Sequence, residues 1–222
     1  MGPEDEIIVV DGGSTDGSLN GSATGRPAVL FLRVVEAPGA ATDEVIACTD
    51  AGCVPQPRWL ESLRAAFALE PSPDVVTGTY RVEAEGPLEQ AMAAACYPDP
   101  ETASGGSRFE VLYGRLLGRT FEASRPTGRS VAFTRVAWDG AGGFPEHLAT
   151  GEDVTSGKSI VEHGGRAVLP PGALVVWRQR PTVAATARMY FRYGADGARS
   201  EDRGLIGRDL LRATVYPAGG HC

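Results

Sequence analysis

Residues 6–18 read Glu-Ile-Ile-Val-Val-Asp-Gly-Gly-Ser-Thr-Asp-Gly-Ser, and this stretch indicates the fold class. Its four consecutive β-branched residues form a short apolar run that stops at turn residues. This pattern is typical of a strand buried on both faces, as in a parallel sheet covered by helices. Asp11 stands where the run ends. Ligands of open α/β sheets bind outside the carboxyl ends of the strands, so Asp11 is placed to meet a ribose hydroxyl or a base N–H.

Small residues follow Asp11 and favour the same interpretation. Gly13 and Ser14 allow the backbone to approach a nucleotide closely. The alternative is a buried strand followed by an ordinary polar turn, which needs no ligand.

Bulk properties limit the function classes. The 222 residues suffice for one sizeable domain with a core, and the net charge of −7 argues against nucleic acid as the main partner. The four cysteines form no C-x-x-C pair, so we expect no zinc site. We expect no secretory signal, because residues 1–6 are acidic and lack an apolar core. No apolar run reaches the roughly 20 residues that cross a bilayer. We expect a cytoplasmic protein whose contact with the inner face of a membrane is peripheral.

A second apolar segment ends at a carboxylate in the same way. Residues 44–49 read as a strand, and Asp50, Ala51 and Gly52 follow it. The alternative for Asp50 is a helix N-cap, but the next predicted helix, residues 57–69, begins too far downstream to be capped directly.

A third block combines glycines with two acids. Gly142 and Gly143 suggest a tight turn with exposed backbone N–H groups. Asp153, which follows Glu152, begins a predicted helix over residues 154–163. Helix capping and the helix dipole would account for both acids without catalysis. Between these blocks, Arg129 stands in a turn before a predicted strand, where a guanidinium could contact phosphate oxygens or could be simply solvated.

These blocks, in this order, resemble family 2 glycosyltransferases of the GT-A fold over about residues 6–199. The resemblance implies an α/β fold with a GT-A-type nucleotide-binding mixed, mostly parallel sheet flanked by helices. Residues 1–200 would form one GT-A-like domain, and residues 201–222 a C-terminal helix and tail.

The implied reaction is inverting transfer of a sugar from a nucleotide-diphosphate sugar to an unidentified acceptor hydroxyl. Asp153, helped by Glu152 as a second catalytic residue, would be the base that removes the hydroxyl proton. The nucleotide-sugar-binding residues would be Asp11, Gly13, Ser14, Asp50, Ala51, Arg129, Gly142 and Gly143.

The family pattern also implies a divalent cation, Mg²⁺ or Mn²⁺, that neutralises the leaving diphosphate. Relatives carry an Asp-x-Asp block, but Gly52 stands at the second Asp here. Many relatives place a His near position 177, which is Trp177 in this chain. Asp50 is thus the only metal ligand that this block predicts.

Two segments of the family pattern are missing from the sequence, namely an apolar strand ahead of the first block and a helix before Asp50. We therefore expect a shortened transferase or a fragment. One way to complete the sheet is a homo-oligomer, in which another copy of the chain fills the place of the missing strand. The competing hypothesis is a catalytically inactive nucleotide-sugar-binding or assembly protein. A dinucleotide-dependent oxidoreductase is disfavoured, because no Gly-x-Gly-x-x-Gly turn follows an early strand.

A predicted amphipathic helix over residues 181–193 carries Arg188 and Arg192. An exposed basic face is the simpler interpretation, and contact with anionic lipid headgroups is the alternative.

Overall fold

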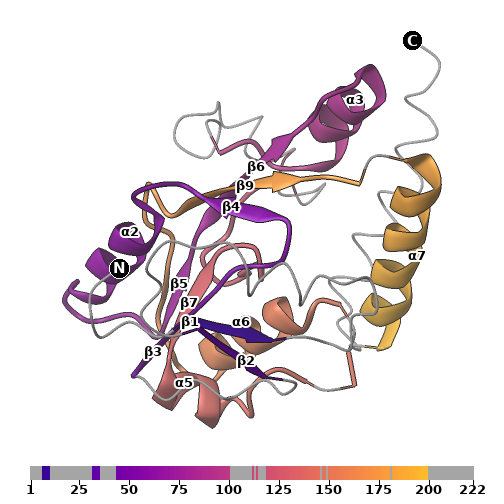
Figure 1. Cartoon of the computed structure of the whole chain (residues 1–222). Coiled ribbons are helices and arrows are strands. Elements are labelled where there is room, and N and C mark those ends of the chain that lie inside the picture. The colour runs from indigo at the N-terminus through magenta and orange to yellow at the C-terminus, as the bar shows by residue number, and fades with distance from the viewer. Residues whose placement is uncertain are drawn as a thin grey trace. The chain divides into compact units, whose positions relative to one another are not determined.

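The computed structural model (Figure 1) describes residues 7–10, 32–35, 44–100, 112, 114, 119–145, 147–148, 150–180 and 182–199. The chain divides into two units, Met1–Ile46 and Ala47–Cys222, and each is described by itself. The expected single domain over residues 1–200 stays a prediction.

In the first unit, two short strands form a parallel pair. β1 (Ile7–Val10) lies beside β2 (Leu32–Val35), with Ile7 opposite Leu32 and Val10 opposite Val35. The apolar run that opens the first motif is therefore a parallel strand, as its β-branched residues predicted.

The second unit alternates strands and helices. The division falls within β3 (Val45–Cys48), whose end lies in this unit. The later elements are β4 (Cys53–Pro55), α2 (Trp59–Phe67), β5 (Val75–Thr77), β6 (Thr79–Glu83), α3 (Pro87–Cys96), β7 (Val131–Thr134), α5 (Arg135–Gly140), α6 (Glu152–Glu162), β8 (Ala167–Val168), β9 (Leu174–Arg178) and α7 (Val183–Arg199). The mixed α/β class expected from the sequence is confirmed.

Two mixed sheets organise these elements. One has the order β3-β7-β5-β8, in which β5 pairs antiparallel with β7 and parallel with β8. The other has the order β4-β9-β6, in which β9 pairs antiparallel with β4 and parallel with β6. Pro55 lies in the edge strand β4, where a missing N–H is tolerated.

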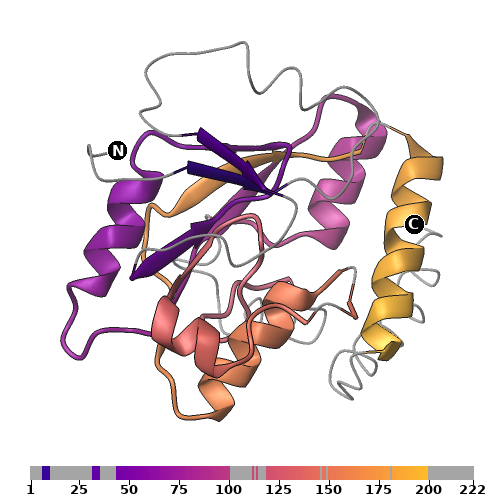
Figure 2. The same cartoon turned by 60° about the horizontal axis from the view of Figure 1, so that its bottom comes forward.

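The larger sheet carries helices on both faces, because successive side chains of a strand point to opposite sides. Val75 and Phe133 belong to a buried cluster that includes Ile160 of α6. Val76 belongs instead to a cluster with Leu63 of α2. α5 and α6 thus cover one face and lie side by side (Figure 2), while α2 covers the other.

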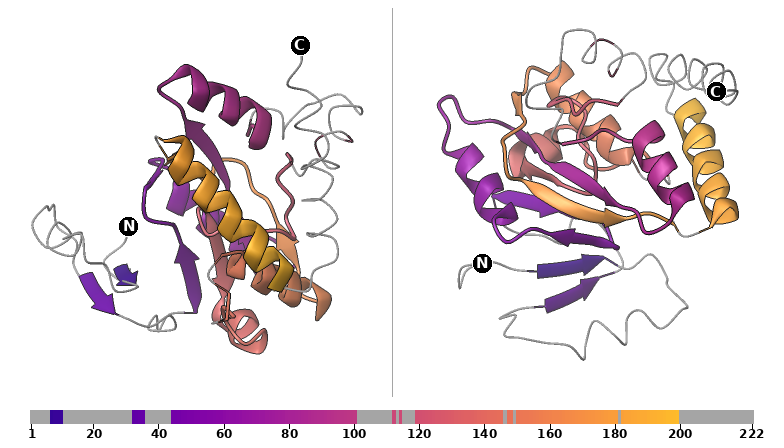
Figure 3. Two further views of the ribbon diagram at one scale, coloured as in Figure 1. Left: turned by 90° about the vertical axis from the view of Figure 1, so that its right-hand side faces the viewer. Right: turned by 90° about the horizontal axis from the view of Figure 1, so that it is seen from above.

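A third cluster joins the smaller sheet to α7. It contains Tyr80, Tyr97, Val175, Trp177 and Met189. The Tyr190 hydroxyl also contacts the Tyr97 hydroxyl at 3.1 Å, which links α7 to the end of α3. Figure 3 shows α7 alongside α3 in the view from above. The helix predicted from residue 181 is confirmed and continues to Arg199.

Gly78 separates two strands. Residues 74–82 alternate and are rich in β-branched residues, and this pattern predicts a single strand. β5 and β6 belong instead to different sheets, so that prediction is wrong. The reason is a close backbone approach at Gly78, whose N–H donates to the Ser130 carbonyl at 2.8 Å. A Cβ at Gly78 would lie 1.8 Å from Ser130 Oγ, so only glycine fits there.

Candidate active site

The segment that follows β3 forms a tight turn at Asp50. The N–H of Cys53 donates to the Asp50 carbonyl at 3.1 Å, and Gly52 adopts φ +85°. A positive φ at the third position of a turn favours glycine, which gives a local reason for Gly52. Thr49 ties the turn to a neighbouring segment, because its hydroxyl donates to the Arg129 carbonyl at 2.9 Å. β4 follows directly, so Asp50 caps no helix.

Asp50 and Asp153 converge on Gly128. A Cβ built on Gly128 would lie 2.8 Å from Asp50 Oδ1 and 3.4 Å from Asp153 Oδ2. Two of the three acids predicted from distant motifs therefore share one site. The third, Asp11, lies outside the described residues.

Asp153 is held at the start of α6 by hydrogen bonds from two backbone N–H groups. Its Oδ2 accepts the N–H of Gly128, and its Oδ1 accepts the N–H of Val154 at 2.7 Å. The residue at the N-cap is Gly151, and α6 has no side-chain cap hydrogen bond. Each carboxylate oxygen retains a second lone pair, so Asp153 can still accept a proton.

Burial is the main reason that the pKa values of both carboxylates and of two nearby thiols are raised. Burial raises the pKa of Asp50, Arg129 opposes this, and Asp153 adds to it, although Asp50 keeps an exposed edge. Burial also raises the pKa of Asp153, against its backbone hydrogen bonds and Arg129. Burial, with repulsion from Asp50, raises the pKa of Cys48 to about 12 and that of Cys53 to about 11. Both thiols are therefore protonated and poor nucleophiles at neutral pH.

Arg129 lies against aromatic rings rather than in solvent. Its guanidinium carbon is 4.1 Å from the Trp177 ring centroid and 4.7 Å from the Tyr80 ring centroid. Nη1 donates to the Thr127 hydroxyl at 3.1 Å, and Nη2 donates to the Tyr193 hydroxyl at 3.4 Å. Burial alone would lower the pKa of Arg129, but Tyr80 and Tyr193 favour its charged form and the pKa is raised.

The other predicted residues are less directly placed. Gly13 and Ser14 lie outside the described residues, and Ala51 is exposed in the turn after β3. Glu152 is the first residue of α6. The roles of these four residues stay predictions.

Gly142 and Gly143 form the expected turn, with φ +81° and +73°. Their N–H groups donate to the carbonyls of Asp139 at 3.0 Å and Trp138 at 2.9 Å. Both N–H groups thus form hydrogen bonds within the turn. Their contact with a sugar stays a prediction, and it requires these hydrogen bonds to break.

Sequence reasoning missed Gly128 and Tyr193. Gly128 matters because both carboxylates approach its Cα, and Tyr193 because its hydroxyl reaches Arg129 from α7. The position of Gly128 beside Arg129 was the only available signal, since its partners are remote in sequence.

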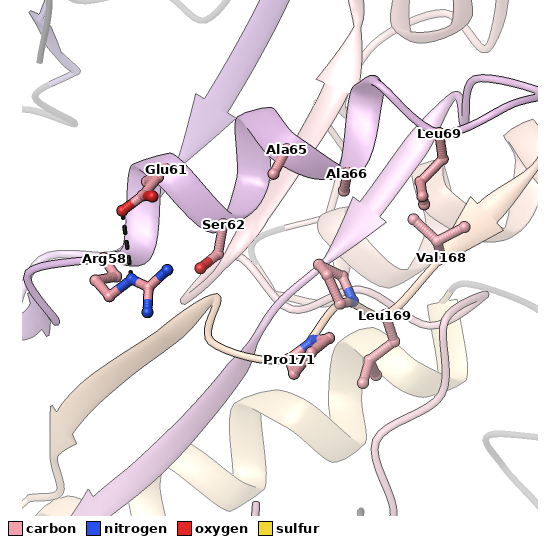
Figure 4. Close-up of a pocket in the computed structure, with 10 residues that line it drawn as sticks. Arg58, Glu61, Ser62, Ala65, Ala66, Leu69, Val168, Leu169 and Pro171 are labelled. Carbon is pink, nitrogen blue, oxygen red and sulfur yellow. Dashed lines mark hydrogen bonds and ion pairs between the residues drawn. The ribbon is translucent and has the colours of Figure 1, made fainter.

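A groove of about 470 Å³ lies elsewhere, between α2 and residues 168–171 (Figure 4). Arg58 and Glu61 form an ion pair there at 3.3 Å. None of the predicted site residues lines the groove, so it is separate from the carboxylate site.

The chain thus combines a mixed α/β fold with two carboxylates that converge on Gly128. Residues 14–194 match the family described as Glycosyltransferase like family 2. Because this match spans most of the chain, the chain belongs to that family and is a glycosyltransferase. No curated protein sequence matches the chain significantly.

A solved structure supports the fold. The mannosyltransferase PcManGT from Pyrobaculum calidifontis, in complex with GDP-Man and Mn²⁺, has a TM-score of 0.56 and 20% sequence identity to this chain. The match covers 98% of this chain and 67% of that chain. At this identity the likeness shows the fold alone, which is of the GT-A type.

The described residues give a divalent cation a poor ligand set. They contain no group of three His, Cys, Asp or Glu side chains that could hold a metal ion. Asp50 and Asp153 are the two carboxylates that the described residues bring together here, each oxygen of Asp153 already accepts one backbone N–H group, and Gly52 has no side chain. A cation would therefore have at most two carboxylate ligands in the described part of the chain, and Arg129 would repel it. These residues do not fit Mg²⁺ or Mn²⁺.

Proposed function

We propose that the chain transfers a sugar from a nucleotide-diphosphate sugar to an acceptor hydroxyl with inversion, and that Asp153 is the base. The observation that carries this proposal is the convergence of Asp50 and Asp153 on Gly128 in a family 2 glycosyltransferase. Inverting transfer needs one carboxylate that takes the proton of the attacking hydroxyl, without a covalent intermediate. The mannosyltransferase that shares the fold was solved with a nucleotide sugar, GDP-Man.

The environment of Asp153 suits a general base. Its raised pKa brings proton affinity closer to the working pH, and its two backbone hydrogen bonds hold the carboxylate in one orientation. In the same proposal Asp11, Gly13 and Ser14 hold the nucleoside. Asp50 and Ala51 lie near the ribose and diphosphate.

The direct test is a panel of nucleotide sugars offered to the purified protein. Release of nucleoside diphosphate measures turnover, and the anomeric configuration of the product, read by NMR, tests inversion. Turnover with retention would contradict the single-displacement mechanism. Donor binding without turnover of any donor, whatever acceptor is supplied, would favour the inactive binding protein instead.

We also propose that the protein is cytoplasmic and contacts a membrane surface through α7. Phe191 is 78% exposed on this helix, and Arg188 and Arg192 are exposed beside it. A basic helix with an exposed aromatic ring favours anionic lipid surfaces. Among the described residues, no helix is long and apolar enough to cross a membrane. Failure of the protein to co-sediment with anionic vesicles would contradict this membrane contact. The expected homo-oligomer is a separate proposal, and light scattering, which measures the molar mass in solution, tests it.

Gly128→Ala is expected to lower the transfer rate about 100-fold without unfolding the protein. The new Cβ would lie 2.8 Å from Asp50 Oδ1, so it would displace the carboxylates that the reaction uses. The measurement is kcat/KM together with thermal unfolding. Gly140→Ala is the matched control, because a Cβ at Gly140 meets nothing within 4 Å. An unchanged kcat/KM in Gly128→Ala would show that the convergence has no role in transfer.

A further inference from the structure

The charge beside Asp50 is a guanidinium that the protein itself supplies. Donor diphosphates leave with developing negative charge, which a cation must neutralise. The structure that shares the fold holds Mn²⁺ with GDP-Man, whereas the described residues of this chain do not fit a divalent cation. The positive charge in this part of the chain is Arg129, which is close enough to lower the proton affinity of both Asp50 and Asp153.

Arg129 is held in place before any ligand arrives. Two aromatic rings, Tyr80 and Trp177, contact its guanidinium at 4.7 and 4.1 Å. Trp177 lies on β9 directly opposite Cys53, at the end of the Asp50 turn. The backbone confirms the link, since the N–H of Arg178 donates to the carbonyl of Gly52 at 3.3 Å. Trp177, which contacts the guanidinium, is therefore joined through β9 to the turn that carries Asp50.

The guanidinium still has donors to offer. Of its five N–H groups, one donates to Thr127 at 3.1 Å and one to Tyr193 at 3.4 Å, and both partners are neutral hydroxyls. Nε is buried and has no hydrogen-bond partner among the described residues. No described carboxylate forms an ion pair with Arg129. A half-buried, charged and incompletely bonded guanidinium is well suited to take a bidentate anion such as a phosphate.

We propose that Arg129 takes the place of the divalent cation, so that the nucleoside diphosphate is bound and its charge neutralised by this guanidinium without metal. The inference rests on the proposed function, because it concerns the same donor site. It goes further by naming the group that meets the diphosphate and by making donor binding independent of Mg²⁺ and Mn²⁺. The aromatic contacts explain how the charge stays in place: the rings hold the guanidinium without neutralising it.

The first experiment uses the unaltered protein. GDP and UDP are titrated calorimetrically into protein stripped with EDTA, and again in millimolar Mn²⁺. The expected result is a Kd in EDTA within about threefold of the Kd in Mn²⁺. Binding that appears only with Mn²⁺, or that tightens more than about tenfold with it, overturns the inference while leaving the proposed function intact. Absence of nucleoside diphosphate binding under both conditions overturns the proposed function itself.

The second experiment separates a diphosphate contact from a merely structural role. Arg129→Met should weaken binding of the nucleoside diphosphate about tenfold or more in EDTA, because a charge-assisted hydrogen bond is lost. Binding of the corresponding nucleoside, followed by ligand-observed NMR, should change little. Equal losses for both ligands would assign Arg129 to the structure alone and contradict the inference.

Two further variants keep this result interpretable. Arg129→Lys retains the positive charge but not the forked donor geometry, so it should keep part of the diphosphate affinity. It serves as the test variant if Arg129→Met folds poorly. Arg58→Met is the matched control, because Arg58 is exposed and forms only a surface ion pair with Glu61. It should leave both affinities unchanged.

Discussion

Asp153→Asn is expected to lower sugar transfer about 10²- to 10⁴-fold while nucleotide-sugar binding persists. Asparagine keeps the shape of the side chain but cannot take a proton from the acceptor hydroxyl. One amide oxygen can still accept a backbone N–H, from Gly128 or from Val154, although the other bond is lost. The raised pKa of Asp153 shows that burial of its negative charge is unfavourable. Removal of that charge offsets part of the cost of the lost hydrogen bond, so we expect the variant to fold.

The pH profile gives a second readout of the same role. Burial raises the pKa of Asp153 above its ordinary value, and the base works only when it is deprotonated. Transfer by the unaltered protein should therefore fall as the pH drops through this raised pKa, and Asp153→Asn should lack that acid limb. Initial rates over a pH series and calorimetric donor affinity are the measurements.

The control for this prediction is Asp139→Asn, which removes an exposed carboxylate on α5. Its rate and donor affinity should match those of the unaltered protein. If Asp153→Asn retains full transfer, the base is another group. If it loses donor binding as well, Asp153 acts on the donor rather than on the acceptor.

The strands and helices that carry the site could be predicted because each depends mainly on residues that are near one another in the sequence. Val45–Cys48 is a short apolar run that stops at Asp50, and the structure confirms a strand that ends there. The predicted helix is confirmed as α6, which begins at Glu152, one residue before the predicted start at Asp153. A single strand or helix depends on nearby residues, so its type and one boundary can be inferred from a window of sequence.

The contacts between elements could not be predicted in the same way. For Arg129 the sequence left a solvated side chain as an alternative, because no residue of its own segment indicates contact with Tyr80 or Trp177. Gly128 was passed over because its importance comes from Asp50 and Asp153, which lie on other elements. β4 was missed because it has only three residues, and Pro55 argues against a strand. These features exist only after the chain has folded.

Gly78→Ala is expected to be the most destabilising of the substitutions considered. Beside the 1.8 Å contact with Ser130 Oγ, the new Cβ would lie 2.4 Å from the Ala173 carbonyl oxygen. Neither neighbour can move freely. Ser130 is fully buried, accepts from Trp59 Nε1 at 2.9 Å and donates to the Ala173 carbonyl at 3.0 Å. Relief would require two strands to separate, which is the overpacking case.

We expect Gly78→Ala to lower the free energy of unfolding by about 3 kcal/mol and the melting temperature by about 6–12 °C. Urea denaturation and thermal unfolding measure the two quantities. Gly86→Ala is the control, because a Cβ at Gly86 meets nothing within 4 Å. Gly86 is the N-cap of α3, where alanine is less favourable than glycine, so its effect should stay within about 1 kcal/mol. Equal stability of the two variants would contradict the close approach at Gly78.

Gly78→Ala should also alter the geometry of the carboxylate site, because Ser130 follows Gly128 and Arg129 directly in the chain. Any displacement of Ser130 moves the backbone that donates to Asp153 and carries the guanidinium. At temperatures where Gly78→Ala is still folded, its affinity for nucleoside diphosphates should therefore fall. Gly86→Ala should keep full affinity. A folded Gly78→Ala with unchanged affinity would show that the 128–130 segment is positioned independently of the joint between the two sheets.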